Sequence, residues 1–302
     1  MSVGTFTSPQ ARAEFDLAYE AGMRALPEPT ATHDVRTDFG SVRVYRFGPA
    51  KGAPIVLLSG HGGTALMWRP NLAAFAERHP VYALDLLGEP GRSEQTSAIR
   101  DGADQAAWLH AVLATLDLDG VHLVGASIGG WHACNLAVRA PARLASISLL
   151  DPANTLGRIT AALVFRVGLA SLPLISRWGR PAFLRWISGG DTGPADDPVA
   201  TVIDAGMRGY RMRLPTPKYF TDDQLRSIRV PVLALVAGRS VIHRPEAAHA
   251  RASALIPHVQ AELWPTATHG ISGTHAEEVN AAVLRFIADS PASNTPLQLR
   301  SE

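Results

Sequence analysis

One serine, Ser127, is flanked by small residues in the stretch Gly125-Ala126-Ser127-Ile128-Gly129, which fits the pattern G-x-S-x-G. The stretch follows an apolar run and opens a helical pattern. Glycines at both ends permit a sharp strand-to-helix turn that larger side chains would obstruct. A serine on such a turn projects its hydroxyl above a sheet, where it can attack a carbonyl carbon. The alternative is a plain small-residue contact between helix and sheet, so companion residues must decide.

A serine hydroxyl is a poor nucleophile until a base removes its proton, so this chemistry requires a histidine. Of the eleven histidines, His269 follows the last predicted strand and precedes the last predicted helix. His258 and His275 fit less well, because each lies within or beside a helical pattern. A serine early and a histidine last, each after a strand, favours His269 as the base over an ordinary surface-loop histidine.

The oxyanion that forms in acyl transfer needs two N–H donors. Ile128 supplies one candidate, since its backbone N–H points from a helix N-terminus towards the serine. The stretch "LLSGHGGTALMW" ends an early predicted strand in a glycine-rich turn, and the N–H of Gly63 is the second candidate. Ordinary turn chemistry would also explain these glycines.

The elements that must position these residues alternate between short apolar runs and longer helical patterns, which predicts a mostly parallel, doubly wound α/β sheet. Strands are expected at Ser41–Phe47, Pro54–Leu58, Val81–Asp85, Val121–Gly125, Ala145–Leu150, Val232–Ala237 and Ala261–Trp264. Helices are expected at Asp101–Leu116, Ile128–Val138, Pro245–Leu255 and Ala276–Ala288.

This rhythm breaks between Leu150 and Val232, where only helical patterns and turn residues occur. We therefore expect a core over residues 1–152, an inserted helical cap over 153–228 and the rest of the core over 229–302. Met1–Ser8 and the tail from about Ser290 are expected to be disordered. Between residues 153 and 218 nine basic residues face four acidic ones. This excess suits an anionic or carbonyl-rich substrate, although a solvated outer face is the commoner explanation.

Composition narrows the function classes. The chain of 302 residues is 46% hydrophobic, and its 28 basic and 27 acidic residues give a formal net charge of +1. Such a balance disfavours nucleic acid and membrane partners and favours a small-molecule substrate. One cysteine, no secretory signal and no membrane-length apolar run favour the cytoplasm. No metal or other cofactor is expected, and the oligomeric state is left open, with a homodimer as one alternative.

These pieces together resemble the α/β-hydrolase fold superfamily, and more narrowly bacterial esterase-like serine hydrolases with a helical lid. The resemblance rests on "HGG" with "MWRPN", "VYALDLLGEPGRSE", "HLVGASIGGW", "DQLRSIRVPVLALVAG" and "PTATHGIS". It implies Ser127 as nucleophile, His269 as base, and oxyanion donors at Gly63 and Ile128. The fold hosts many activities, so the resemblance says less about the substrate.

The chain departs from that family at the acid of the triad. The family places an Asp or Glu after the strand that here runs "VPVLALVAGRSVIH", and Ser240 occupies this position. We favour Asp151, which follows the strand after the nucleophile helix; its alternative role is a helix N-cap or an Asx turn before Pro152. Glu246 is a second candidate, and the absence of any acid is the third.

The residues therefore predict hydrolysis of a small-molecule carboxylic ester or thioester through an acyl-enzyme on Ser127. A protein of this fold without hydrolytic turnover is the competing interpretation, either a ligand binder or a biosynthetic lyase or cyclase. The displaced acid favours the competing interpretation, whereas the serine, histidine and glycine loop favour the hydrolase.

Overall fold

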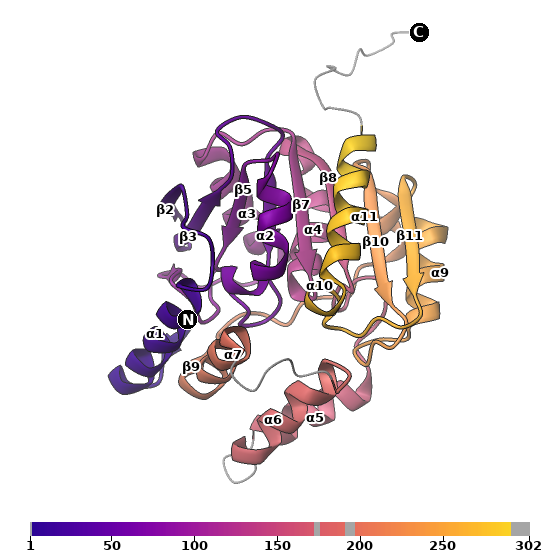
Figure 1. Cartoon of the computed structure of the whole chain (residues 1–302). Coiled ribbons are helices and arrows are strands. Elements are labelled where there is room, and N and C mark those ends of the chain that lie inside the picture. Colours follow the sequence, from indigo (N-terminus) through magenta and orange to yellow (C-terminus); the bar gives the residue numbers. More distant parts are fainter. Residues whose placement is uncertain (1, 172–175, 191–196, 291–302) are drawn as a thin grey trace, which may run out of the picture.

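The computed structural model describes residues 2–171, 176–190 and 197–290. Within them, nine strands form one twisted sheet at the centre of the molecule (Figure 1). The strands are β2 (Ala31–Thr37), β3 (Gly40–Phe47), β4 (Ile55–Leu58), β5 (Val81–Leu84), β6 (Glu94–Gln95), β7 (Val121–Ala126), β8 (Leu144–Leu150), β10 (Val232–Ala237) and β11 (Val259–Trp264). All seven predicted strands are present, with ends that differ by no more than two residues.

The order along the sheet is β11-β10-β8-β7-β4-β5-β3-β2, with β6 paired to β3. The six strands from β11 to β5 are parallel, whereas β3 pairs antiparallel with β5, β2 and β6. Because the parallel strands share one direction, their carboxyl ends meet at one edge of the sheet, where ligands of open α/β sheets bind. The strand β2 was not predicted from the sequence.

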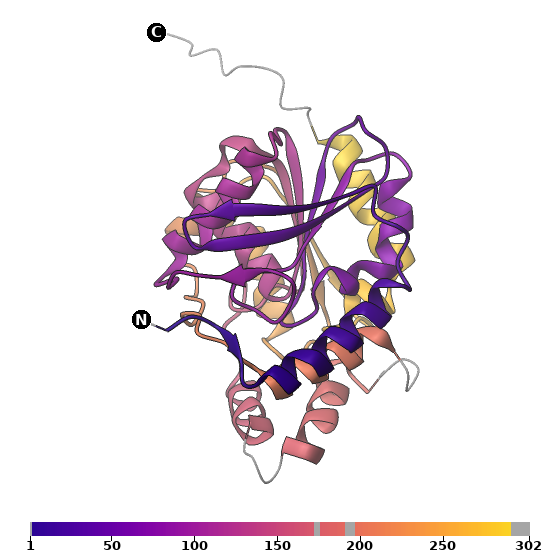
Figure 2. The same cartoon turned by 90° about the vertical axis from the view of Figure 1, so that its left-hand side faces the viewer.

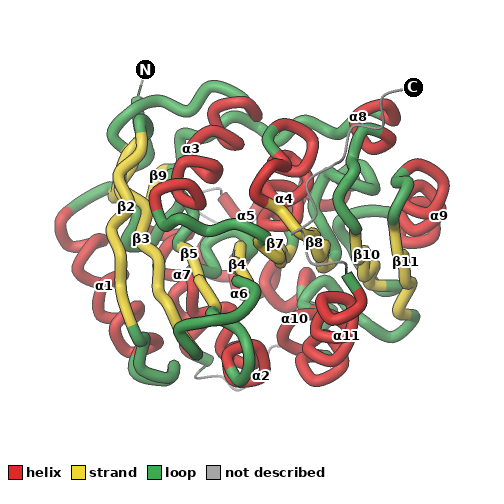
Figure 3. The backbone as a smooth tube through the Cα atoms, turned by 90° about the horizontal axis from the view of Figure 1, so that it is seen from above, coloured by secondary structure: helices red, strands yellow, loops and turns green. Residues whose placement is uncertain are grey.

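Helices cover both faces of the sheet (Figure 3). One face carries α3 (Gly102–Thr115), α4 (Ile128–Arg139) and α9 (Pro245–Leu255), and the other carries α2 (Arg69–Ala76) and α11 (Ala276–Asp289). Every residue of β7, β8 and β10 is buried, as expected for strands that helices cover on both faces. The α/β-hydrolase architecture predicted from the sequence is therefore present.

The segment between β8 and β10 is mostly helical, as predicted. It contains α5 (Ala161–Ser171), α6 (Ser176–Ile187), α7 (Pro198–Gly209), a two-residue strand β9 (Tyr210–Arg211) and α8 (Asp222–Arg226). Helices α5 and α6 pack on each other and project beyond the carboxyl ends of the strands (Figure 1). The division into core and cap at residues 153 and 228 stays a prediction.

The amino-terminal segment is ordered, and the expectation of disorder over Met1–Ser8 is wrong for residues 2–8. Thr5–Phe6 forms β1, which pairs antiparallel with β9, and helix α1 (Pro9–Met23) follows. Helix α1 runs alongside α7 (Figure 2). Its start is set by Ser8, whose side chain accepts the N–H of Ala11. Of the predicted disordered tail, residues 291–302 lie outside the described part of the chain.

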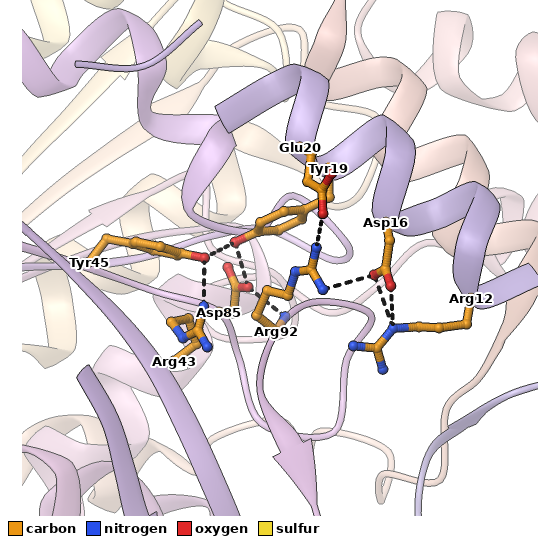
Figure 4. Close-up of polar contacts among 8 residues, drawn as sticks. All are labelled: Arg12, Asp16, Tyr19, Glu20, Arg43, Tyr45, Asp85 and Arg92. Atoms are coloured by element: carbon orange, nitrogen blue, oxygen red, sulfur yellow. Dashed lines mark hydrogen bonds and ion pairs between the residues drawn. The ribbon is translucent and has the colours of Figure 1, made fainter. Parts of the chain in front are cut away.

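Arg92 ties α1 to the core (Figure 4). Its guanidinium lies 3.2 Å from an oxygen of Asp16 and 3.0 Å from one of Glu20, both on α1. The backbone N–H of Arg92 donates to Asp85 Oδ2 at 2.8 Å. The Tyr19 hydroxyl of α1 donates to that same oxygen at 2.8 Å. The buried Asp85 therefore holds α1 against the sheet.

Two further elements are short. The 3-10 turn η1 (Ala65–Trp68) precedes α2, and α10 (Ile271–Thr274) precedes α11. Neither α1, α2 nor α10 was predicted from the sequence. No helix within residues 2–171, 176–190 and 197–290 is both long and apolar enough to cross a membrane.

Candidate active site

Ser127 lies on a strained turn between β7 and α4. Its backbone has φ 52° and ψ −116°, a region that non-glycine residues rarely occupy. A Cβ at Gly129 would lie 2.0 Å from the carbonyl oxygen of Leu58, so only glycine permits the turn to approach β4. The N–H of Ser127 donates to Leu150 O at 3.0 Å, which helps to hold the strained conformation.

His269 comes from the loop after β11 and reaches the serine. Its Nε2 lies 3.0 Å from Ser127 Oγ, although the two residues are 142 positions apart. The imidazole is mostly buried, with 11% of its side chain exposed. This distance is within hydrogen-bonding range of a general base and its nucleophile. The structure thus brings together the two residues that the sequence paired.

Asp151 lies on the other side of the imidazole. Its Oδ2 is 2.6 Å from His269 Nδ1, and the residue is fully buried at the end of β8. Glu246, the second candidate, is exposed in the first turn of α9. Among the carboxylates of the described residues, Asp151 is therefore the one that contacts His269. An imidazole with Nδ1 protonated presents its unprotonated Nε2 to Ser127 Oγ.

The Asp151 carboxylate has further partners on both oxygens. Ser240 Oγ donates to Oδ2 at 2.6 Å, and the backbone N–H of Ala237 donates to Oδ1 at 3.1 Å. His243 Nε2 lies 3.0 Å from Oδ1. Burial alone would raise the pKa of Asp151, but the contacts with His243 and His269 outweigh it and hold the pKa well below its usual range. The carboxylate is therefore charged at neutral pH.

Sequence reasoning missed His243 as a neighbour of the triad. No role for His243 was predicted from the sequence. In the structure the side chain of His243 is 1% exposed, and neither ring nitrogen has hydrogen-bond geometry with a described residue, so the contact of Nε2 with Asp151 is a close polar approach. The available signal was its place, three residues after Ser240 and before the helix α9. Within the described residues no group of three or more His, Cys, Asp or Glu side chains could hold a metal ion.

The first predicted oxyanion donor, Ile128, is the first residue of α4. Its N–H makes no hydrogen bond to any described residue and lies at the helix N-terminus beside Ser127. The second prediction, Gly63, is contradicted. The Gly63 N–H donates to Gly60 O at 3.0 Å, so it closes a tight turn instead of facing a substrate.

The same turn leaves a different donor next to the serine. A Cβ at Gly60 would lie 3.5 Å from Ser127 Cβ, so this backbone runs directly against the nucleophile. The N–H of Gly62, where φ is 65°, donates to Glu89 Oε2 at 2.7 Å. The N–H of His61 makes no hydrogen bond to the described residues. His61 is therefore the loop residue whose N–H is available beside Ser127.

The Glu89 side chain holds this turn through contacts with His61 and Gly62. Its carboxylate is 3% exposed and, besides the Gly62 N–H, contacts His61 Nδ1 at 2.7 Å. Burial would raise the pKa of Glu89, but the charge and hydrogen bond of His61 and the amide of Gly62 lower it overall. Desolvation would lower the pKa of His61, but the charge of Glu89 raises it overall. The two groups therefore favour an ion pair.

Comparison with known proteins places this geometry in a family. Residues 53–173 match the model of the alpha/beta hydrolase fold. The chain is 31% identical over 291 residues to carboxylesterase YbfK of Bacillus subtilis (strain 168), across 93% of this chain and 96% of that protein.

Solved structures give the same result. The crystal structure of carboxylesterase CesB (YbfK) from Bacillus subtilis superposes with a TM-score of 0.85 at 28% identity, covering 92% of this chain and 98% of that one. The naproxen esterase (carboxylesterase NP) from Bacillus subtilis also has a TM-score of 0.85, at 29% identity over 92% and 99% of the two chains. The chain belongs to the α/β-hydrolase fold family and, within it, to the bacterial carboxylesterases.

Proposed function

We propose that this carboxylesterase hydrolyses small-molecule carboxylic esters through an acyl-enzyme on Ser127, with His269 as general base and Asp151 as the acid of the triad. The observation that carries the proposal is the continuous contact from Ser127 Oγ to His269 Nε2 at 3.0 Å and from His269 Nδ1 to Asp151 Oδ2 at 2.6 Å. The chemistry requires this order of nucleophile, base and orienting carboxylate.

In the first half-reaction Ser127 Oγ attacks the ester carbonyl while His269 Nε2 takes the hydroxyl proton. The charged Asp151 stabilises the imidazolium that results. The backbone N–H groups of Ile128 and His61 donate to the oxyanion. His269 then gives the proton to the leaving alcohol, and the acyl group remains on Ser127.

In the second half-reaction His269 removes a proton from water, which attacks the acyl-enzyme carbonyl. The tetrahedral intermediate collapses, Ser127 regains its proton from His269, and the carboxylic acid leaves. Every atom in this cycle comes from the ester, from water or from the residues named, so a small-molecule ester is the only partner required. The cytoplasmic location and the state of assembly expected from the sequence stay predictions.

The test combines a fluorophosphonate probe with ester turnover. The purified chain should be labelled at Ser127, located by mass spectrometry, and should hydrolyse 4-nitrophenyl acetate and butyrate. Ser127→Ala should lose both labelling and turnover while keeping the same unfolding temperature. Folded protein that neither reacts with the probe nor turns over any ester would contradict the proposal and favour a ligand binder, or a lyase or cyclase of this fold.

A further inference from the structure

A positively charged depression of about 470 Å³ lies between the cap and the loop after β10. Two arginine residues line it, Arg185 on helix α6 and Arg239, the residue before Ser240. Among the residues that the structure describes, no acidic side chain lines it. The lining residues are Arg185, Trp186, Gly189, Gly190, Arg239 and Val241.

The arginines of this depression are available to a ligand. Arg185 and Arg239 are both exposed, and neither has an ion-pair partner among the described residues. A third guanidinium, that of Arg166 on α5, lies 4.6 Å from the centre of the Trp186 ring. Such stacking leaves the edge of a guanidinium free to donate hydrogen bonds. Within the described ranges 2–171, 176–190 and 197–290, the charged side chains that line the depression are therefore all cationic.

The depression adjoins the residues that carry the triad. The N–H of Arg239 donates to Ala267 O at 2.9 Å, which joins the loop after β10 to the loop that carries His269. A Cβ at Gly189 would lie 2.3 Å from Thr268 Cγ2, so the turn after α6 rests on the residue directly before His269. Thr268 directly precedes His269, so the depression lies next to the loop that carries the imidazole.

A buried polar group lies at this same junction. Thr268 Oγ1 is buried and has no hydrogen-bond partner. A buried hydroxyl without a partner is uncommon and lowers the stability of the fold. A ligand that forms a hydrogen bond with Thr268 Oγ1 would remove this cost. It belongs to the loop against which the cap turn packs.

We propose that Arg185 and Arg239 form a subsite for an ionised carboxylate, and that the preferred substrates are esters whose acyl part carries a second, free carboxylate. This inference rests on the proposed esterase function. A guanidinium binds a carboxylate through two parallel N–H donors, which fixes the direction of the bound molecule as well as adding affinity. A monoester of a dicarboxylic acid then places its carboxylate between the arginines and its ester carbonyl at Ser127.

The experiment compares monomethyl and dimethyl esters of straight-chain dicarboxylic acids of four to eight carbons, with acid release followed in a pH-stat at pH 7.5. Wild-type kcat/KM should be higher for the monoester than for the dimethyl ester at the chain length that spans the two sites. Added salt should reduce this preference, because it screens charges that are exposed to solvent.

Two variants and a control assign the preference to the depression. Arg185→Gln and Arg239→Gln should each lower kcat/KM for the monoester about tenfold, mainly through a higher KM. Each should change kcat/KM for the dimethyl ester by less than about twofold. Arg211→Gln removes an exposed cap arginine outside the depression and should leave kcat/KM unchanged for both esters. Equal effects of the two variants on both esters, or a wild-type preference for the dimethyl ester, would overturn the inference while leaving the esterase proposal intact. No hydrolysis of any ester would overturn the esterase proposal, and this inference with it.

Discussion

Ser240 Oγ donates a 2.6 Å hydrogen bond to Asp151 Oδ2, the same oxygen that lies 2.6 Å from His269 Nδ1. Ser240 stands where the resemblance places an acidic residue, whereas the carboxylate comes from the neighbouring strand. Because β8 and β10 are adjacent and parallel, the residues that follow them meet at one edge of the sheet. A carboxylate from either strand can therefore reach the same imidazole.

Replacing this carboxylate should disable catalysis without unfolding the chain. Asp151→Asn should lower kcat by about 10⁴-fold, because the amide favours the wrong imidazole tautomer and provides no charge for the imidazolium. The measurement is kcat for 4-nitrophenyl butyrate at pH 7.5, with the unfolding temperature as control. A loss of less than about tenfold would contradict the role of Asp151.

The serine at position 240 offers a rescue. In the background of Asp151→Asn, the second change Ser240→Asp places a carboxylate within the reach of His269 from β10. We expect it to recover at least about tenfold in kcat over the single variant, since orientation and charge each contribute to the rate. Ser240→Asp alone should lower activity, because two adjacent buried carboxylates cannot both stay ionised.

The chemistry-bearing residues that sequence reasoning identified share one property. Ser127, His269 and Asp151 each follow a strand of the parallel sheet, so strand patterns alone place them at the same edge. The second oxyanion donor could not be found this way. The choice between the amides of Gly63 and His61 depends on hydrogen bonds within the turn and on Glu89, which lies 27 residues from Gly62 in the chain.

The elements that sequence reasoning missed depend on tertiary contacts. Helix α1 carries few large apolar residues, and its buried positions Phe15, Tyr19 and Gly22 contact the core and neighbouring elements rather than forming a wide apolar stripe. The start signal, Ser8 before Pro9, was nevertheless visible. The role of His243 depends likewise on the position of a loop that no hydrophobic period predicts.

His243 should act as a positioning residue for Asp151. Its Nε2 is 3.0 Å from Asp151 Oδ1, inside a fully buried site. His243→Leu should lower kcat about tenfold, equivalent to about 1.4 kcal/mol, with little change in KM, because it removes the polar neighbour of a buried carboxylate. His243→Gln keeps a donor and should retain more activity.

The pH profile of kcat separates this role from simple packing. His243→Leu removes an imidazole next to Asp151 and should therefore shift the low-pH side of the plot of kcat against pH. His243→Gln keeps a polar group there and should shift it less. Loss of stability in both variants, with an unchanged pH profile, would show that His243 only fills space.

The Glu89 carboxylate should contribute more to kcat than the His61 imidazole that it contacts. Glu89→Ala frees the Gly62 N–H and loosens the turn, so the His61 N–H loses its position beside Ser127. We expect kcat to fall about 10²-fold with a small change in KM, as for the loss of one oxyanion donor. His61→Ala keeps the backbone N–H and should cost less than about fivefold. If His61→Ala were the more damaging variant, the imidazole rather than the amide would be the functional group.

Acid should destabilise the fold through two buried histidines behind the site. Burial lowers the pKa of His122 to about 4, and it does the same for His132. The unfolded chain, with pKa values near 6.5, binds more protons than the native state between about pH 6.5 and 4, so stability falls as the pH drops through that window. Each histidine contributes a slope of roughly 1.4 kcal/mol per pH unit.

The pKa of Asp151 is lowered in the folded chain, so its carboxylate also contributes to the unfolding free energy. That contribution is lost only when the pH falls below about 4, which is below the range in which the two histidines titrate. Urea unfolding at pH 7, 6, 5 and 4 measures the slope of the unfolding free energy in the window of the histidines. His132→Gln should reduce this slope by about one proton, because the glutamine does not titrate. The side chain is enclosed by Trp108 and Trp131, so the variant is compared with wild type at pH 7 to separate packing from protonation. An identical slope in both proteins would show that His132 carries the same charge in the folded and the unfolded chain.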